Sequence, residues 1–274
     1  MQYELFSQCN YKFFSLGSGS SGNCYYLGNK SYGILIDAGI GVRSINKTLR
    51  EYGISFSNIA GILVTHDHAD HIKTVGCLGT KYNIPVYTTQ VIHEGISRSR
   101  YTQTDLQASR KIIEKETPFS INDFEITAFE VPHDSIENVG YHITFSGQTF
   151  VLITDVGCIT DKVKHYAALA HHLVVETNYD EDMLRNGRYP YFLKERITSG
   201  MGHLSNRLSA DFIADIYHQK MRNIWLCHLS QDNNHPELAY KTVESALREK
   251  GVIAGVDVRL EALSRYKASG LREF

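Results

Sequence analysis

The sequence predicts an α/β fold of the α+β type, in which two mixed sheets are flanked by helices. Short apolar runs alternate with helical patterns along most of the chain. Two consecutive strand candidates, residues 140–145 and 150–154, flank Ser146-Gly147-Gln148-Thr149, which is typical of a hairpin turn. A hairpin within strand–helix alternation favours two mixed sheets over a purely parallel, doubly wound sheet. We find no linker, internal repeat or low-complexity segment, so we expect one domain over residues 1–274.

The expected elements follow from runs of apolar residues and from helical spacing. In the helix expected at residues 42–52, Ile45, Leu49 and Tyr52 share one face and Gly53 supplies the stop. Further helices are expected at residues 160–170, 205–218 and 236–250. Strands are expected at residues 25–27, 33–36, 61–64, 86–88, 124–131, 140–145, 150–154, 173–176 and 223–227.

Composition narrows the class of protein. Of the 274 residues, 42% are apolar and 21% are charged, which is ordinary for a globular protein in solution. A net charge of −2 lacks the electrostatic signature of a stoichiometric nucleic-acid binder. It still allows an enzyme that handles nucleic acid through a local basic patch or through metals. No apolar run approaches 18 residues, so we expect no membrane span.

Cysteine usage and the first residues indicate a cytoplasmic protein. Residues 1–6 lack the basic and apolar regions of a signal peptide. The cysteines are odd in number and show no CxxC spacing, so we expect reduced thiols rather than a disulfide framework. They are Cys9, Cys24, Cys77, Cys158 and Cys227.

Metal-competent side chains cluster directly after one apolar run. Residues 59–64 are apolar, and His66-Asp67-His68-Ala69-Asp70-His71 follows them closely. Burying so many titratable groups beside a core is costly unless something compensates. A divalent cation is the natural compensation, because neutral imidazole and carboxylate are ligands for zinc and its neighbours.

The spacing within this cluster favours two cations. Residues two apart in an extended segment point to the same side, so His66 and His68 can share one cation. A turn after His68 then directs Asp70 and His71 to a second position. Two cations about 3.5–4 Å apart can hold a bridging hydroxide between them. His133, Asp155 and His228 each follow a later apolar run closely and are further candidate ligands.

This set of residues resembles the metallo-β-lactamase superfamily over nearly the whole chain. The resemblance implies an αββα sandwich with a dinuclear site at one edge. It gives His66, His68 and His133 to the first metal, and Asp70, His71 and His228 to the second, with Asp155 bridging the two. Asp37, in the run Ile34-Leu35-Ile36-Asp37-Ala38-Gly39, would orient a ligand histidine without binding metal.

Three further motifs resemble the YycJ/WalJ group of that superfamily. They are Gly19-Ser20-Ser21-Gly22-Asn23, Gly202-His203-Leu204-Ser205-Asn206 and His228-Leu229-Ser230 with Asn233-Asn234. The resemblance implies a phosphodiesterase or nuclease that uses two divalent ions, Zn²⁺ or Mn²⁺. Its substrate would be nucleic acid, with DNA favoured, degraded as by a 5′-to-3′ exonuclease. We see no long insertion between Asp155 and His228 like the cap domain of RNA-processing nucleases.

Two residues outside the ligand set are candidate catalytic groups. Asp67 could accept or relay a proton from the nucleophilic water. His203 follows Gly200-Met201-Gly202, which allows close backbone approach, and Ser205 or Asn206 could cap the next helix. His203 could therefore contact a substrate phosphate or protonate a leaving oxygen. The alternative for His203 is a loop histidine with a structural hydrogen bond.

Other readings of the sequence stay open. The glycine-rich loop at residues 17–22 lacks a GK[ST] ending, so a tight turn against the cleft is favoured over a nucleotide loop. A small-molecule hydrolase acting on a thioester, lactone or cyclic phosphodiester could use the same metals, and an iron-binding oxidoreductase is a further alternative. A set of basic residues has two interpretations, a basic rim that faces the substrate or ordinary solvated surface. These residues are Arg98, Arg100, Arg185, Arg188, Lys194 and Arg196.

Overall fold

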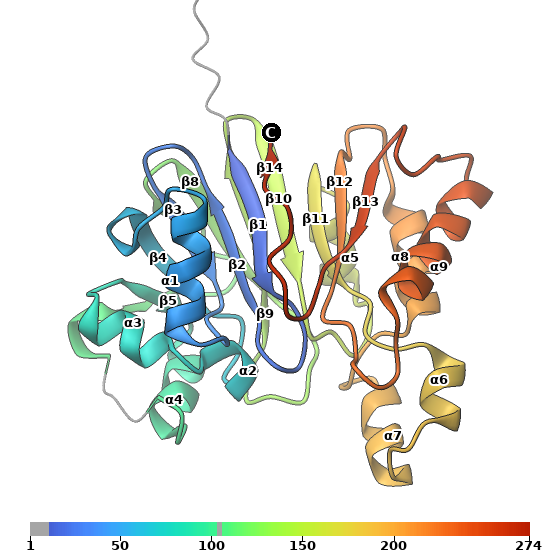
Figure 1. Cartoon of the computed structure of the whole chain (residues 1–274), viewed down its shortest axis with the longest axis horizontal. Helices are drawn as coiled ribbons and strands as arrows, with labels where there is room; N and C mark the ends of the chain where they lie inside the picture. Colours follow the sequence, from blue (N-terminus) through green and yellow to red (C-terminus); the bar gives the residue numbers. More distant parts are fainter. Residues whose placement is uncertain (1–10, 103–105) are drawn as a thin grey trace, which may run out of the picture.

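The computed structural model describes residues 11–102 and 106–274, in which two seven-stranded sheets pack face to face with helices on their outer faces (Figure 1). This arrangement confirms the expected sandwich of two mixed sheets. Cys9 and residues 1–6, which entered the expectation of a cytoplasmic location, lie outside the described residues. No helix in the described ranges has the length and apolar character needed to cross a membrane. Cys24, Cys77, Cys158 and Cys227 are free thiols, as expected.

The first sheet has the strand order β14-β1-β2-β3-β4-β5-β6. In this order, neighbouring strands pair antiparallel from β14 through β1 and β2 to β3, and they pair parallel from β3 through β4 and β5 to β6. The strands are β1 Lys12–Gly17, β2 Cys24–Gly28, β3 Gly33–Ile36, β4 Ile59–Leu63, β5 Val86–Thr88, β6 Arg110–Ile112 and β14 Arg272–Glu273.

The second sheet has the order β13-β12-β11-β10-β9-β8-β7 and the same division, antiparallel from β7 to β10 and parallel from β10 to β13. The predicted hairpin joins β9 to β10, and its turn residues Ser146 and Gly147 have φ of 45° and 72°. The strands are β7 Phe119–Ile121, β8 Phe124–Glu130, β9 Val139–Phe145, β10 Gln148–Ile153, β11 His172–Glu176, β12 Asn223–Cys227 and β13 Arg259–Ala262.

The helices that the sequence predicted are present with slightly shorter bounds. They are α1 Val42–Glu51, α5 Asp161–Ala167, α8 Asn206–Ile216 and α9 Pro236–Glu249. Ser205 caps α8 by accepting a hydrogen bond from the Leu208 amide, as expected. Helices that the sequence did not predict are α2 Ala69–Ile72, α3 Val75–Lys81, α4 Gln90–Arg98, α6 Glu181–Asn186 and α7 Tyr191–Thr198. Two short 3₁₀ turns are η1 Phe56–Asn58 and η2 Gln107–Ser109.

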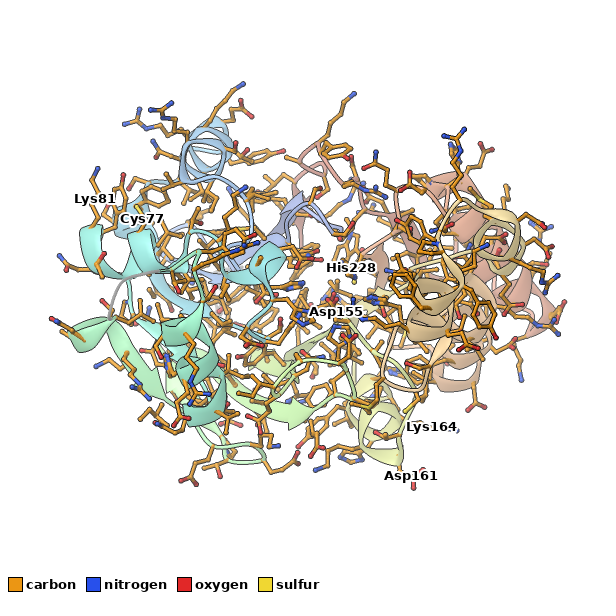
Figure 2. The ribbon with its side chains drawn as sticks, turned by 90° about the horizontal axis from the view of Figure 1, so that it is seen from below. Cys77, Lys81, Asp155, Asp161, Lys164 and His228 are labelled. Atoms are coloured by element: carbon orange, nitrogen blue, oxygen red, sulfur yellow. The ribbon has the colours of Figure 1, made fainter. Side chains whose placement is uncertain are left out.

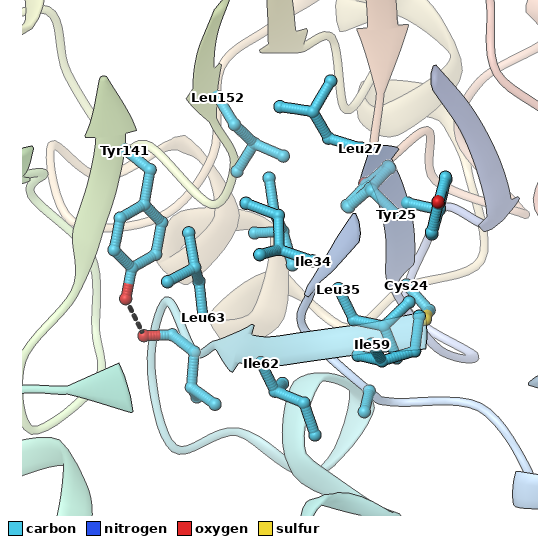
Figure 3. Close-up of a cluster of buried hydrophobic side chains, with 14 of the residues drawn as sticks. Cys24, Tyr25, Leu27, Ile34, Leu35, Ile59, Ile62, Leu63, Tyr141 and Leu152 are labelled. Atoms are coloured by element: carbon cyan, nitrogen blue, oxygen red, sulfur yellow. Dashed lines mark hydrogen bonds between the residues drawn. The ribbon is translucent and has the colours of Figure 1, made fainter. Parts of the chain in front are cut away.

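The core has two layers because the central strands are buried on both faces. Phe150 and Leu152 of β10 belong to the cluster that fills the space between the sheets, whereas Val151 and Ile153 pack under the outer helices. Tyr141 of β9 spans the inter-sheet core, and its hydroxyl donates to the Val64 carbonyl at 2.7 Å (Figure 3). This bond ties the second sheet to the segment that carries the histidine cluster.

Candidate metal centre

The candidate ligands meet at one edge of the sandwich because the parallel strands end there. Asp37 follows β3, His66 lies just beyond β4, Asp155 follows β10 and His228 follows β12. Asp37, Asp155 and His228 have φ of 60°, 53° and 53°. Such left-handed backbone is uncommon for residues other than glycine and is concentrated at functional sites. It turns each chain sharply at the strand end, so that the side chain joins the cluster.

Two ligand groups form at this edge. Potential ligand atoms of His66, His68 and His133 lie within 4.8 Å of one another, as do those of Asp70, His71 and His228. Asp155 lies between them, since it groups both with His66 and His71 and with His228. Figure 2 shows Asp155 and His228 close together near the middle of this edge. The fold therefore brings together all seven residues that the sequence marked as ligands.

The histidine nitrogens in this cluster fit a metal centre. Nε2 of His66 and Nε2 of His228 are buried and lack a well-formed hydrogen bond in the described part of the chain, and His228 Nε2 has only the Asp70 carboxylate, at 3.5 Å. Their Nδ1 atoms are engaged, with Thr65 Oγ1 at 3.0 Å for His66 and with Glu176 Oε1 at 2.9 Å for His228. Unpaired buried nitrogens are costly, and a cation bound at each ligand group would give these nitrogens a partner. The N/O donor set suits a divalent transition metal.

Further contacts hold the remaining rings. His71 Nδ1 lies 2.7 Å from Asp37 Oδ2, and Asp37 also accepts from the Thr65 amide at 2.9 Å. His133 Nδ1 lies 3.0 Å from the Gly202 carbonyl. Each Nδ1 donates outward, which fixes the tautomer and leaves Nε2 facing the centre. His71 Nε2 accordingly lies 3.2 Å from Asp155 Oδ2.

The surroundings of the cluster shift the pKa values of its histidines in opposite directions. Burial lowers the pKa of His66 well below its usual value, and the neighbouring His71 lowers it further. Burial also disfavours charge on His228, but Asp155, Asp70 and Glu176 more than offset this and raise its pKa to about 10. Burial opposes ionisation of Asp155, yet His228 and His71 hold its pKa well below the usual range. The pKa values of His71 and His228 in the second group are thus raised, whereas metal ligands must be deprotonated, so a cation there would compete with protons.

Glu176, the last residue of β11, is a central residue that the sequence analysis missed. It is fully buried, and Oε2 accepts from the amides of Val156 and Leu204 at 3.0 and 3.2 Å. Oε1 lies 2.8 Å from His203 Nδ1 and 2.9 Å from His228 Nδ1. The available signal was a carboxylate at the end of an apolar run, the same signal that marked Asp155.

His203 lies in a cleft beside the ligands. This cleft has a volume of about 180 Å³ and is also lined by Ser20, Asn178, Arg196 and His228. Burial lowers the pKa of His203, but the charge of Glu176 and its hydrogen bond reverse this and raise the pKa above its usual value. His203 thus presents a proton-bearing ring to the cleft, with Nδ1 held by Glu176.

The loop before β2 packs against the same cleft, as the tight-turn interpretation expected. Ser18 Oγ accepts from the His228 amide at 2.9 Å, and Ser20 lines the cleft. Asn23, whose role the sequence analysis did not foresee, places Nδ2 2.9 Å from His71 Nε2 and 3.5 Å from Asp70 Oδ2.

Asp67 lies apart from the ligand groups. Its carboxylate faces α4, since a Cβ built on Gly95 would lie 2.4 Å from Asp67 Oδ2. Alternation along the extended segment explains this, because His66 and His68 point to one side and Asp67 to the other. Among the described residues, Asp67 belongs to none of the candidate ligand groups. The proton-relay role expected for Asp67 stays a prediction that this geometry does not support.

Comparisons with known proteins extend these observations. A family model described as "Beta-lactamase superfamily domain" matches residues 32–228. The chain is 36% identical over 246 residues to exodeoxyribonuclease YycJ of Bacillus anthracis, covering 88% of this chain and 90% of that protein. It is 33% identical over 267 residues to exodeoxyribonuclease WalJ of Streptococcus pneumoniae, covering 97% of this chain and 99% of that protein. Among solved structures, the metallo-beta-lactamase fold protein YhfI of Bacillus subtilis matches with a TM-score of 0.70 at 18% identity, covering 97% and 100% of the two chains.

Proposed function

The chain belongs to the beta-lactamase superfamily, and we propose that it is a metal-dependent exodeoxyribonuclease that uses two divalent cations, Zn²⁺ or Mn²⁺, and degrades DNA from 5′ to 3′. The observation that carries the metal-dependent activity is the pair of histidine–carboxylate groups that share Asp155. The choice of DNA rests on the names of two relatives that match nearly the whole chain. These relatives do not favour a small-molecule hydrolase or an iron-binding oxidoreductase.

We assign one cation to His66, His68 and His133 and the other to Asp70, His71 and His228, with Asp155 between them. When bound, such a pair supplies Lewis acidity and lowers the pKa of a bound water. Asp37 orients His71, as the 2.7 Å contact between Asp37 Oδ2 and His71 Nδ1 supports. A cation at the second group would be held by the deprotonated forms of His71 and His228.

His203 and Glu176 act on the leaving group in this proposal. Hydrolysis of a phosphodiester breaks the bond between phosphorus and the leaving oxygen, which must gain a proton. With Nδ1 bonded to Glu176, His203 has Nε2 available to donate that proton in the cleft. The charge of Glu176 and its hydrogen bond raise the pKa of His203 above its usual value, which favours the protonated ring. His203 is therefore the general acid, and Glu176 positions it.

The test is digestion of duplex DNA labelled at either end, with Mn²⁺ or Zn²⁺ added to chelator-treated protein. We expect nucleotides to be released successively from the 5′ end. His68→Ala should abolish release, whereas His203→Ala should keep the wild-type metal content and lower kcat about 10²–10⁴-fold. His165→Ala, an exposed histidine on α5, is the matched control and should behave as wild type.

Three outcomes would contradict parts of this proposal. Hydrolysis of a thioester or lactone by protein that leaves every polynucleotide intact would show a small-molecule hydrolase. Release from the 3′ end would refute the polarity alone. Loss of metal in His203→Ala would make that residue a ligand.

A further inference from the structure

Helix α7 presents two adjacent aromatic side chains to solvent beside the candidate centre. Tyr191 and Phe192 are 75% and 72% exposed, so both rings leave most of their surface in water. Two large rings that are exposed side by side form an apolar patch, and such a patch needs an explanation that single apolar residues scattered over the surface do not. Helices α6 and α7 extend from the sandwich at the edge where the ligands lie (Figure 1).

The same helix forms a wall of the cleft. Leu193, Arg196 and Ile197 of α7 line the cleft that contains His203 and His228. Phe192 lies four residues before Arg196, so these side chains neighbour each other on the helix surface. The exposed ring of Phe192 therefore continues the cleft wall onto the outer surface.

A groove opens on the other side of α7. It has a volume of about 580 Å³ and is lined by Arg185 of α6 and by Tyr191, Lys194 and Thr198 of α7. Tyr191 is held in place, since its hydroxyl donates to Glu195 Oε1 at 2.5 Å. A continuous surface thus runs from the cleft across Phe192 and Tyr191 into this groove.

Charge alone does not indicate which ligand this surface binds. Arg188 has no carboxylate partner among residues 11–102 and 106–274, and Lys194 bonds the Arg185 carbonyl at 2.7 Å. The acidic and basic side chains of residues 179–204 balance, however, being Asp180, Glu181, Asp182 and Glu195 against Arg185, Arg188, Lys194 and Arg196. A ligand that binds here must gain mainly from the aromatic faces, with a few cations in support.

We propose that Tyr191 and Phe192 form a stacking platform for the single-stranded part of the DNA substrate, next to the nucleotide at the metal centre. This inference rests on the proposed function. Every base offers a flat π-face, so two exposed rings can hold consecutive bases without sequence preference. Lys194 on α7 and Arg188 in the loop between α6 and α7 are the cations that would then contact the phosphates between these bases.

The test compares two substrates of the same protein, a single-stranded dodecathymidylate and bis(p-nitrophenyl) phosphate. The small diester reaches the metal centre without needing the platform. The readout is the ratio of kcat/KM for the oligonucleotide to kcat/KM for the diester. We expect this ratio to fall at least tenfold in the Tyr191→Ala/Phe192→Ala double variant, mainly through the KM for DNA. Phe192→Leu should lower the ratio, whereas Phe192→Trp should preserve it. Leu208→Ala, an exposed apolar residue on α8, is the control and should leave it unchanged.

Two results would overturn the platform. One is a ratio in the double variant within twofold of wild type. The other is a wild-type dimer in sedimentation that the double variant dissociates, because the rings would then be covered by a second copy. Wild-type protein that hydrolyses the diester but leaves all DNA intact would instead refute the proposed function itself.

Discussion

At the scale of single residues, the candidate centre depends on buried groups that hold its histidines. Glu176 accepts from two backbone amides through Oε2 and faces two imidazoles through Oε1, so both oxygens of its carboxylate have two partners. Burial raises the pKa of Glu176, but His203 and its hydrogen bonds lower it more, so the group stays ionised. A positioning carboxylate of this kind sets both the tautomer and the orientation of the rings.

Glu176→Gln tests this role with little change in shape. The amide oxygen can still accept from the Val156 and Leu204 amides, but the amide nitrogen cannot accept from His203 or His228. We expect kcat to fall roughly 10–100-fold. We also expect the alkaline limb of the pH–rate profile to move to lower pH, since His203 loses the charge that raises its pKa. Glu130→Gln, at the end of β8, is the matched control. An unshifted profile with full activity would refute the role.

Gly39 allows the close approach that places Asp70. A Cβ at Gly39 would lie 1.5 Å from the Asp70 carbonyl oxygen, which also accepts from the Asn23 amide. Gly39→Ala must therefore displace α2 and Asp70, and we expect it to lower the free energy of unfolding by about 1–3 kcal/mol and to weaken metal binding. Gly41→Ala meets only Ser44 Oγ at 3.9 Å and serves as the control. Equal denaturant midpoints and metal contents for the two variants would contradict this account.

Sequence patterns predicted the ligand set better than the groups around it. The seven candidate ligands are histidines and carboxylates that closely follow apolar runs, and these two features marked them in the sequence. Glu176 also ends an apolar run, but its partners His203, His228 and two backbone amides lie far from it along the chain, as do the partners of Asn23, so their roles could not be read from local pattern. Asp67 shows the converse case, because its residue type fits the motif but its side chain faces away from the ligand groups.

At the scale of elements, a polar ladder links three parallel strands at the edge opposite the centre. His172 starts β11, and its Nε2 lies 2.6 Å from Gln148 Oε1 of β10. Its Nδ1 lies 2.7 Å from Asn223 Nδ2 of β12. Burial, with the positive charges of His171 and Arg222, lowers the pKa of His172 to about 3. The ring is therefore neutral in the folded protein.

This ladder predicts a pH dependence of stability. The unfolded chain binds a proton at His172 below about pH 6.5, whereas the folded chain does so only near pH 3, so stability falls as the pH falls between these values. The contribution is at most about 1.4 kcal/mol per pH unit. Between pH 7.5 and 5.5, chelator-treated His172→Gln should lose about 1 kcal/mol less unfolding free energy than wild type in guanidinium titrations. His165→Gln should match wild type. An identical pH dependence in His172→Gln would refute the assignment.

Elements were predictable where local pattern decides them. The central strands contain apolar runs, residues 150–153 in β10 and 173–175 in β11, because both of their faces are buried there, and a predicted helix such as α1 buries one apolar stripe. The strands that the sequence analysis missed are β1, β6, β7, β13 and β14. Of these, β6 and β14 are short and charged, with sequences Arg-Lys-Ile and Arg-Glu, and they pair with β5 and β1. Helices α6 and α7 were missed because few of their residues are buried.

At the scale of the whole molecule, metals should stabilise the fold, because the complete ligand set exists only when both sheets are in place. A ligand at 100 times its Kd stabilises the folded state by about 2.7 kcal/mol. We therefore expect Mn²⁺ to raise the melting temperature of chelator-treated protein by roughly 5–10 °C in calorimetry. Asp155→Ala should remove most of this rise. A rise that Asp155→Ala keeps would place the stabilising metal elsewhere.

That residues 1–274 form one domain stays a prediction, which a single cooperative transition in the same scan would support.

The stoichiometry of metal binding tests the central claim most directly. Isothermal titration of chelator-treated protein with Mn²⁺ should give two equivalents per chain for wild type. It should give one equivalent for His68→Ala, which disrupts only the first group, and fewer than two for His228→Ala. A single equivalent in wild type, or two equivalents in His68→Ala, would contradict a dinuclear centre built from these residues.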